Sequence, residues 1–228
     1  PFKPEEKVVE SFVAKEGRLE GMKLKDYFDE LSSDSPAPGG GSVAAVSGAQ
    51  AAALVSMVAN LTHGKKGYED AWKDMERVAI EAQKLKDELN ATIDADTDAF
   101  NALMAAMRKR ARTDEAKTEK AKAVEAATLN AIEVPLSVVR NMVKVMDLAA
   151  ETAQKGNRNS ISDVSTAAAQ AKAATEAAHD NVMINVPGLE DKKKAKALLD
   201  ESQKLLASVT KMSQDVTDTV HKVLKAEL

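Results

Sequence analysis

Apolar residues recur every three to four positions along most of this chain, which is the spacing that places them on one face of an α-helix. The composition agrees, because alanine is abundant and aromatic residues make up only 3% of the sequence. No segment reads convincingly as a strand. We therefore predict an all-α protein, an antiparallel bundle of about six helical segments, at 22–32, 43–61, 69–112, 113–155, 160–185 and 189–225.

The segment 43–61 has the character of a central helix. No charged residue occurs between Asp34 and Lys65, and its larger apolar residues are separated by Ala, Ser and Gly. Small residues let neighbouring helices approach closely, so we expect this helix at the centre of the bundle or in a dimer interface formed by helices. A membrane span is disfavoured, because Ala, Ser, Gly and Gln50 supply little hydrophobicity.

The remaining segments suggest a linker followed by one domain. Residues 1–20 read as a linker that carries a short helix, and residues 21–228 read as one helical domain. Pro135 falls inside a predicted helix and should kink it, because its ring removes a backbone donor.

Composition also excludes several function classes. The 32 basic and 36 acidic residues are interspersed and give a net charge of −4, so neither nucleic acid nor an anionic membrane is an expected partner. The absence of cysteine excludes disulfides and thiol nucleophiles. The three histidines lie far apart without metal-ligand spacing, so we expect no metal site.

The stretch Ser35–Ser42, SPAPGGGS, is a candidate ligand loop. Its glycines let the backbone approach another group closely, and Ser42 can cap the helix that follows. Free amides and the helix dipole at such a start favour a carboxylate or another electron-rich group. The loop has neither the Gly-Lys-Ser/Thr of a P-loop nor the preceding strand of a dinucleotide site. The simpler alternative is a turn without a ligand.

Asp96 is the candidate catalytic residue. The apolar stripe of its helix runs through Leu89, Ile93 and Phe100, and this register requires a buried residue at position 96, whereas Asp94 and Asp98 fall on a solvated face. Burial tends to raise the pKa of a carboxyl group toward the range useful for proton transfer. The alternative is a structural carboxylate paired with a backbone group or a lysine.

Other polar residues are open to two interpretations. Lys65 and Lys66, between glycines, form either a cationic turn for a polyanionic tail or a solvated helix end. Asn181 and Asn185, one turn apart, either present amides to a ligand or bond between helices. Asp163 reads most simply as a charge at a helix N-terminus.

Several motifs together resemble the cyclodeaminase domain of the formiminotransferase-cyclodeaminase family. The likeness extends over residues 22–228, and the first residues, PFKPEEKVVESFV, resemble the junction that follows the formiminotransferase domain. The motifs are SDSPAPGGGSVAA at 33–45, MVANLTHGKK at 57–66, IDADTDAF at 93–100, VPLSV at 134–138, GN and SD within 156–163, and NVMIN at 181–185.

The resemblance implies a cytoplasmic homodimer or higher oligomer that closes 5-formiminotetrahydrofolate to 5,10-methenyltetrahydrofolate and releases ammonia in histidine degradation. It implies a polyglutamylated folate as substrate, tetrahydrofolate as the carrier with no tightly bound cofactor, and a formiminotransferase domain or protein as a partner. Similar single-domain proteins carry methenyltetrahydrofolate cyclohydrolase activity, so this reaction is the enzymatic alternative for the present chain. A non-catalytic helical binding or assembly module is the alternative from another class.

The resemblance also assigns roles to residues. The second aspartate of the DAD motif is the family's catalytic residue, and it falls on Asp96, which the helical register selects independently. The family often has Arg where Lys65 and Lys66 stand, so the charge is kept while bidentate geometry is lost. The remaining roles are folate contacts by Gly39, Gly40, Gly41 and Ser42, glutamate-tail contacts by Lys65 and Lys66, and further substrate contacts by Asn157, Asp163, Asn181 and Asn185.

Overall fold

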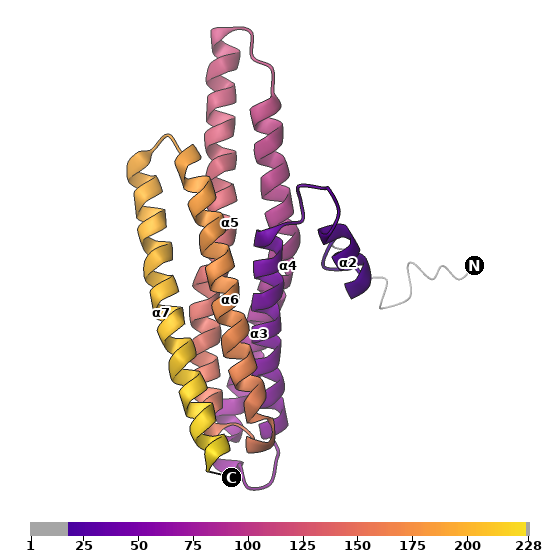
Figure 1. The fold of residues 1–228 in the computed structure, drawn as a ribbon, viewed down its shortest axis with the longest axis vertical. Helices are drawn as coiled ribbons and strands as arrows, with labels where there is room; N and C mark the ends of the chain where they lie inside the picture. The colour runs from indigo at the N-terminus through magenta and orange to yellow at the C-terminus, as the bar shows by residue number, and fades with distance from the viewer. Residues whose placement is uncertain (1–17, 227–228) are drawn as a thin grey trace, which may run out of the picture.

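The computed structural model describes residues 18–226 as a bundle of long antiparallel helices with one short helix beside it (Figure 1). The prediction of an all-α fold is confirmed, since this part of the chain contains six α-helices and no strand. The α-helices are α2 (Leu24–Leu31), α3 (Gly40–Thr62), α4 (Trp72–Arg108), α5 (Asp114–Lys155), α6 (Ile161–Asn185) and α7 (Lys192–Lys225), and the 3₁₀ turns are η2 (Glu69–Ala71), η3 (Arg158–Ser160) and η4 (Val186–Gly188).

Helix α3 occupies the centre of the bundle, where it packs against α4, α5 and α6. Its inner face consists of small residues such as Ala45, Ala51 and Ala52, all fully buried, which allow this close packing. By length and composition α3 could cross a membrane, but most of its apolar window is buried within the bundle.

One face of α3 is nevertheless open to solvent. Met57 is 38% exposed and Leu61 is 49% exposed. Val46 and Leu54, on the same stripe, are partly buried. The alanines face the core together with Val55 and Val58, whereas Val46, Leu54, Met57 and Leu61 form an apolar stripe on the outer face of α3.

Helix α5 begins where the sequence predicts. The Thr113 side chain accepts a hydrogen bond of 3.2 Å from the amide of Ala116, which satisfies one of the free donors of the first turn. The helix then continues to Lys155 with Pro135 inside it. Proline has no amide hydrogen, so the carbonyl of Ala131 loses its partner within the helix.

Helix α2 lies outside the main bundle, on the side of α4, and the residues before it are fastened to α4 (Figure 1). The amide of Leu19 donates a 3.0 Å hydrogen bond to Asp94, and Arg18 forms an ion pair with Asp98. Of the predicted linker 1–20, residues 1–17 lie outside the described residues. The described part of that linker packs against the helical domain.

Candidate functional site

A cavity of about 240 Å³ lies where the N-terminus of α3 meets the middle of α4 and the C-terminal end of α6. Glycine amides, one carboxyl group and two carboxamides make up its polar side, and alanine and larger apolar side chains make up the rest. The lining residues are Pro36, Ala37, Gly39, Gly40, Gly41, Asp96, Ala99, Phe100, Leu103, Ala131, Asn181, Ile184 and Asn185.

The glycine loop and Asp96 are in direct contact. A Cβ atom added at Gly41 would lie 2.1 Å from Oδ1 of Asp96 and 2.5 Å from its Cγ, so no larger residue fits at position 41 without displacing the carboxyl group. Gly40 is nearly as close to α6, because its Cβ would lie 3.3 Å from Nδ2 of Asn181. The glycines thus bring the start of α3 against both polar walls of the cavity.

The surroundings of Asp96 pull its pKa in two directions. Burial favours the neutral carboxyl and raises the pKa, while hydrogen bonds from the Ser42 hydroxyl and the Ser42 amide favour the carboxylate. The Ser42 hydroxyl lies 3.3 Å from Oδ2 of Asp96. Burial is the larger effect, so the pKa of Asp96 lies above its ordinary value of 3.8. Among the described residues, no lysine or arginine forms an ion pair with Asp96.

Ser42 lies elsewhere than predicted. Helix α3 begins at Gly40, with Gly39 at the N-cap position and no side-chain cap, so Ser42 lies inside the first turn. It is fully buried, and its hydroxyl donates a 2.9 Å hydrogen bond to the carbonyl of Ile93. Ser42 therefore supports Asp96 from behind and does not line the cavity, whereas Gly39, Gly40 and Gly41 do.

The three aspartates of the IDADTDAF segment have three different environments. Asp94 accepts the amides of Leu19 and Glu20, and Asp98 pairs with Arg18. Asp96 alone faces the cavity. The predicted register is off by one position, because the buried residue of this turn is Thr97 and Asp96 next to it is half-buried. Asp98 is exposed as expected, but Asp94 is half-buried and not solvated. Asp96 therefore lies at the edge of the core, beside the cavity.

Asn181 and Asn185 lie in the cavity wall opposite the glycines, and their amides also bond within the protein. Nδ2 of Asn181 donates to the carbonyl of Ala177 at 2.8 Å. Nδ2 of Asn185 donates to the carbonyls of Asn181, at 2.8 Å, and Ala131, at 3.1 Å. Features of both sequence interpretations are present, because Asn185 bonds across to α5 and both side chains still border the cavity.

The other predicted site residues lie at the far end of α3. The helix has 23 residues, which corresponds to about 34 Å at 1.5 Å per residue. Lys65 and Lys66 follow it in a turn in which Gly64 and Gly67 have positive φ, and Lys65 lies over the ring of Tyr68. Within one chain the predicted site is therefore two separate groups.

Asn157 and Asp163 belong to this far group. The amide of Asn157 donates to the hydroxyl of Thr62 at 2.8 Å, and its side chain contacts Leu61 and Asn159. Asn157 thus ties the start of α6 to the end of α3. Asp163 lies in the first turn of α6, as the helix N-terminal charge that the sequence indicated. Neither residue lines the cavity around Asp96.

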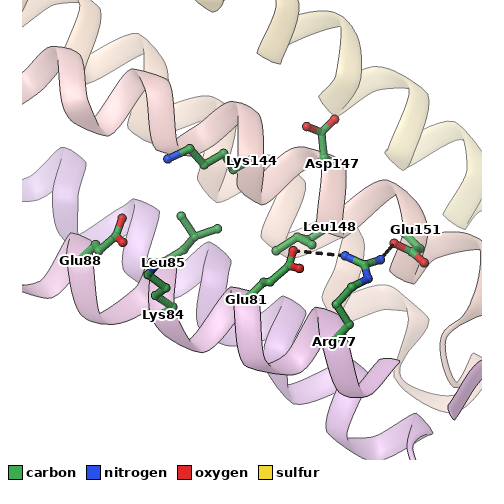
Figure 2. A pocket seen from close by; sticks show the side chains of 9 residues that line it. All are labelled: Arg77, Glu81, Lys84, Leu85, Glu88, Lys144, Asp147, Leu148 and Glu151. Atoms are coloured by element: carbon green, nitrogen blue, oxygen red, sulfur yellow. Dashed lines mark hydrogen bonds and ion pairs between the residues drawn. The ribbon is translucent and has the colours of Figure 1, made fainter. Parts of the chain in front are cut away.

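A second cavity, of about 380 Å³, lies on the outer surface between α4 and α5 (Figure 2). Charged side chains line it, and Arg77 pairs there with both Glu81 and Glu151. It contains none of the predicted site residues, and its charges largely neutralise one another. The smaller cavity around Asp96 is therefore the better candidate for chemistry. Within residues 18–226, no group of three metal-ligating side chains is placed to hold a metal ion.

Sequence reasoning missed two features of the site and its surroundings. Phe100 was assigned to the apolar stripe of its helix, but it lines the cavity, together with Leu103. In α2, Tyr27 is the buried side chain, while Leu24 and Phe28 are 63% and 52% exposed. The spacing of Phe100 one turn after Asp96 was the available signal for the first of these.

Comparison with known proteins gives the family. The model of the formiminotransferase-cyclodeaminase family matches residues 23–204. The chain belongs to this family. It is 40% identical over 197 residues to the methenyltetrahydrofolate cyclohydrolase of Methylorubrum extorquens, which covers 86% of this chain and 95% of the relative. It is 33% identical to the formimidoyltransferase-cyclodeaminase of Sus scrofa over 84% of this chain, which is only 36% of the longer pig protein.

A solved structure also matches in family and fold. The crystal structure of formiminotetrahydrofolate cyclodeaminase from Thermotoga maritima superposes with a TM-score of 0.81 at 30% identity, covering 89% of this chain and 98% of that one. The family resemblance drawn from the motifs is thereby confirmed. These relatives are folate enzymes by name, so the chain is a member of a family of folate-pathway enzymes.

Proposed function

We propose that this protein is a formiminotetrahydrofolate cyclodeaminase, in which Asp96 is the general acid/base. The observation that carries the proposal is the Asp96 carboxyl, held against Gly41 at a cavity wall with its pKa raised by burial. It is the only titratable side chain among the described residues that line this cavity. A raised pKa lets the Asp96 carboxyl group populate both its protonated and its ionised form nearer to neutral pH. A group that both accepts and returns a proton needs both forms.

The reaction needs two proton transfers at neighbouring nitrogens. The formimino group binds as its cationic amidinium, with two hydrogens on the terminal nitrogen. N10 of the folate attacks the formimino carbon, and Asp96 accepts the proton that N10 loses. Asp96 then returns that proton to the formimino nitrogen, which now carries three hydrogens, so its C–N bond breaks and ammonia leaves as the cationic 5,10-methenyl bridge forms. With the substrate protonated in this way, the proton balance closes on one carboxyl group.

The cavity walls suit a flat heterocycle that carries polar groups. Phe100, Leu103 and Ile184 offer apolar surface for the ring face. Gly40 and Gly41 present first-turn amides, and the positive end of the α3 dipole favours electron-rich atoms there. The side-chain oxygens of Asn181 and Asn185 remain acceptors for N–H groups, because their NH₂ groups bond to backbone carbonyls.

Methenyltetrahydrofolate cyclohydrolase is the second candidate, favoured by one specific observation. The Methylorubrum relative of that name is 40% identical and matches over nearly its whole length. In that reaction water takes the place of N10 as nucleophile and N5 is the leaving group, so one acid/base at the same position could serve. The two candidates differ in substrate while sharing the site.

One experiment separates them. The purified protein is given 5-formiminotetrahydrofolate while methenyl product and ammonia are followed, and separately given methenyltetrahydrofolate while its hydrolysis is followed. The Asp96→Asn variant measures the uncatalysed background in both assays. Stoichiometric ammonia supports the cyclodeaminase, and hydrolysis alone supports the cyclohydrolase. If neither substrate turns over, the non-catalytic binding or assembly module becomes the remaining alternative.

We also propose that the protein forms a homodimer through the outer face of α3. Its support is the apolar stripe that ends in Met57 and Leu61, which residues 18–226 leave exposed. A twofold pairing of α3 against its copy in opposite directions would bring Lys65 and Lys66 of one subunit toward the Asp96 cavity of the other. The lysines could then hold the glutamate tail of the same folate. Sedimentation of the wild type and of Met57→Asp tests the pairing, since a charge in this face should yield monomers.

A further inference from the structure

Tyr27 carries a buried polar group that neither the fold nor the mechanism above uses. Its side chain is 6% exposed, and its hydroxyl is the one buried side-chain oxygen or nitrogen in the described part of the chain that has no hydrogen-bond partner. Leaving a buried hydroxyl unpaired costs stability, and phenylalanine would fill the same space without that cost. The hydroxyl therefore calls for a role in another state of the protein.

The segment that carries Tyr27 lies against the turn of α4 that carries Asp96. A hollow between this segment and α4 is lined by Leu19 and by Thr97, the residue next to Asp96. The pKa of the Tyr27 phenol is raised, first by burial and second by the negative charge of Asp96, which agrees with this placement. The chain on both sides of Tyr27 is also fixed around Asp96. Leu19 is bonded to Asp94 on the same turn of α4, and the segment after α2 leads into Gly41, which contacts Asp96.

We propose that Tyr27 is a positioning residue for Asp96, with its hydroxyl donating a hydrogen bond to the Asp96 carboxylate when that group becomes ionised in the working enzyme. Both donors to Asp96 described above come from Ser42 on α3, and the Ser42 hydroxyl divides its one hydrogen between Oδ2 of Asp96 and the carbonyl of Ile93. A phenol from the α2 side would add a donor from a second element, so that the carboxylate would be held from two helices and not from one. Tyr27 itself does not line the cavity, so it acts through Asp96 and not on the substrate.

Other charged groups near this pair have partners of their own. Asp94 accepts backbone amides, and Arg18 neutralises Asp98. Helix α3 contributes no charge, and α6 contributes uncharged asparagines to this wall. The exposed acidic groups of α2 are Asp26, Asp29 and Glu30. If these stay unchanged, a shift in the titration of Tyr27 on replacement of Asp96 reports the interaction between the two groups.

A titration that needs no catalysis tests this inference. The chain has two tyrosines, Tyr27 and Tyr68, and Tyr68 bonds to the amide of Arg158 at the far end of the bundle. In a Tyr68→Phe protein the phenol absorbance reports Tyr27 alone. We expect its apparent pKa to fall when Asp96→Asn is added, because the neighbouring negative charge is gone. An unchanged titration would overturn the inference whatever reaction the protein catalyses.

Kinetics provide the second test, which rests on the proposed function. We expect Tyr27→Phe to move the Asp96-dependent limb of the kcat/KM profile about one to two pH units higher, because a donor to the carboxylate has been lost. KM should stay unchanged, and Tyr68→Phe should behave as wild type. The melting temperature of Tyr27→Phe should be equal to or above that of wild type, since an unpaired hydroxyl has been removed. A lower melting temperature with an unmoved pH profile would show that the hydroxyl has only a structural role.

Discussion

Asn185 donates its side-chain amide to the carbonyl of Ala131, the acceptor that Pro135 leaves free within α5. Pro135 has no amide hydrogen to offer this carbonyl. The free carbonyl accepts the Asn185 amide instead and so fixes that side chain of α6 at the wall of the cavity. Asn185 and Ala131 are 54 residues apart in sequence, yet both line the same corner of the cavity.

Replacing Pro135 by alanine should stabilise α5 and weaken substrate binding. The substituted residue restores the amide that bonds to the carbonyl of Ala131, so that carbonyl no longer depends on Asn185. We expect a melting temperature that is higher by about 2–4 °C for each kcal/mol gained, together with a higher KM. Thermal melts and steady-state kinetics check this, and a lower melting temperature would contradict it.

Asp96→Asn should remove most of the activity and keep the fold. General acid/base groups typically contribute about 10²–10⁴-fold to the rate, so kcat should fall by that order. Asp94→Asn is the matched control, because an asparagine oxygen can still accept the amide of Leu19. Comparable losses in the two variants would mean that Asp96 has no special role.

The same variant should be more stable than wild type at neutral pH. Because the pKa of Asp96 is raised on folding, the folded state binds more protons than the unfolded state between the ordinary value of 3.8 and the raised value. Stability is therefore lost as the pH rises through this window, and Asp96→Asn escapes that loss. Melting curves of both proteins at several pH values should diverge above the window and converge below pH 3.8. If Asp96→Asn is less stable than wild type at neutral pH, burial of the ionised Asp96 does not cost stability and the prediction is wrong.

Gly41→Ala should disable the site by steric contact alone. The added methyl would lie 2.1 Å from Oδ1 of Asp96, so the carboxyl or the start of α3 must move, and such overpacking typically costs about 1–3 kcal/mol. At Gly39 the nearest atom to an added Cβ is 3.8 Å away, so Gly39→Ala should keep the wild-type melting temperature. Activity and melting temperature of the two variants, measured side by side, decide the point.

Lys65 and Lys66 should matter only for long glutamate tails. We expect the double variant Lys65→Met/Lys66→Met to raise KM for a polyglutamylated folate by up to about fivefold for each lysine, and to leave KM for the monoglutamate unchanged. Lys84→Met, at an exposed lysine of the second cavity, controls for the loss of positive charge. An equal rise for both substrates would place the lysines outside the tail site.

Local patterns predicted the helices and the residue at the centre of the site. The spacing of Leu89, Ile93 and Phe100 is a property of one helix, so it located Asp96 without knowledge of any neighbour. The partners of Asp94 and Asp98 are Leu19 and Arg18, which come from a distant part of the sequence. No periodicity within α4 could reveal that contact.

Ser42 and Tyr27 show the same limit. Ser42 has the residue type and position of an N-cap, but the glycines let the helix begin three residues earlier, and its hydroxyl bonds to the carbonyl of Ile93 instead. Tyr27 shares an apolar face with Phe28 in sequence, but only the packing of α2 on the bundle decides which ring is buried. Likewise, the separation of Lys65 from Asp96 follows from the length of α3 and not from either motif.

The bonds of Asp94 and Asp98 have a mechanical consequence. Because Asp94 and Asp98 lie on either side of Asp96 and bind Leu19 and Arg18, the chain just before α2 is tethered to the helical turn that carries Asp96. A pull on Arg18 or Leu19 would therefore act directly on that turn.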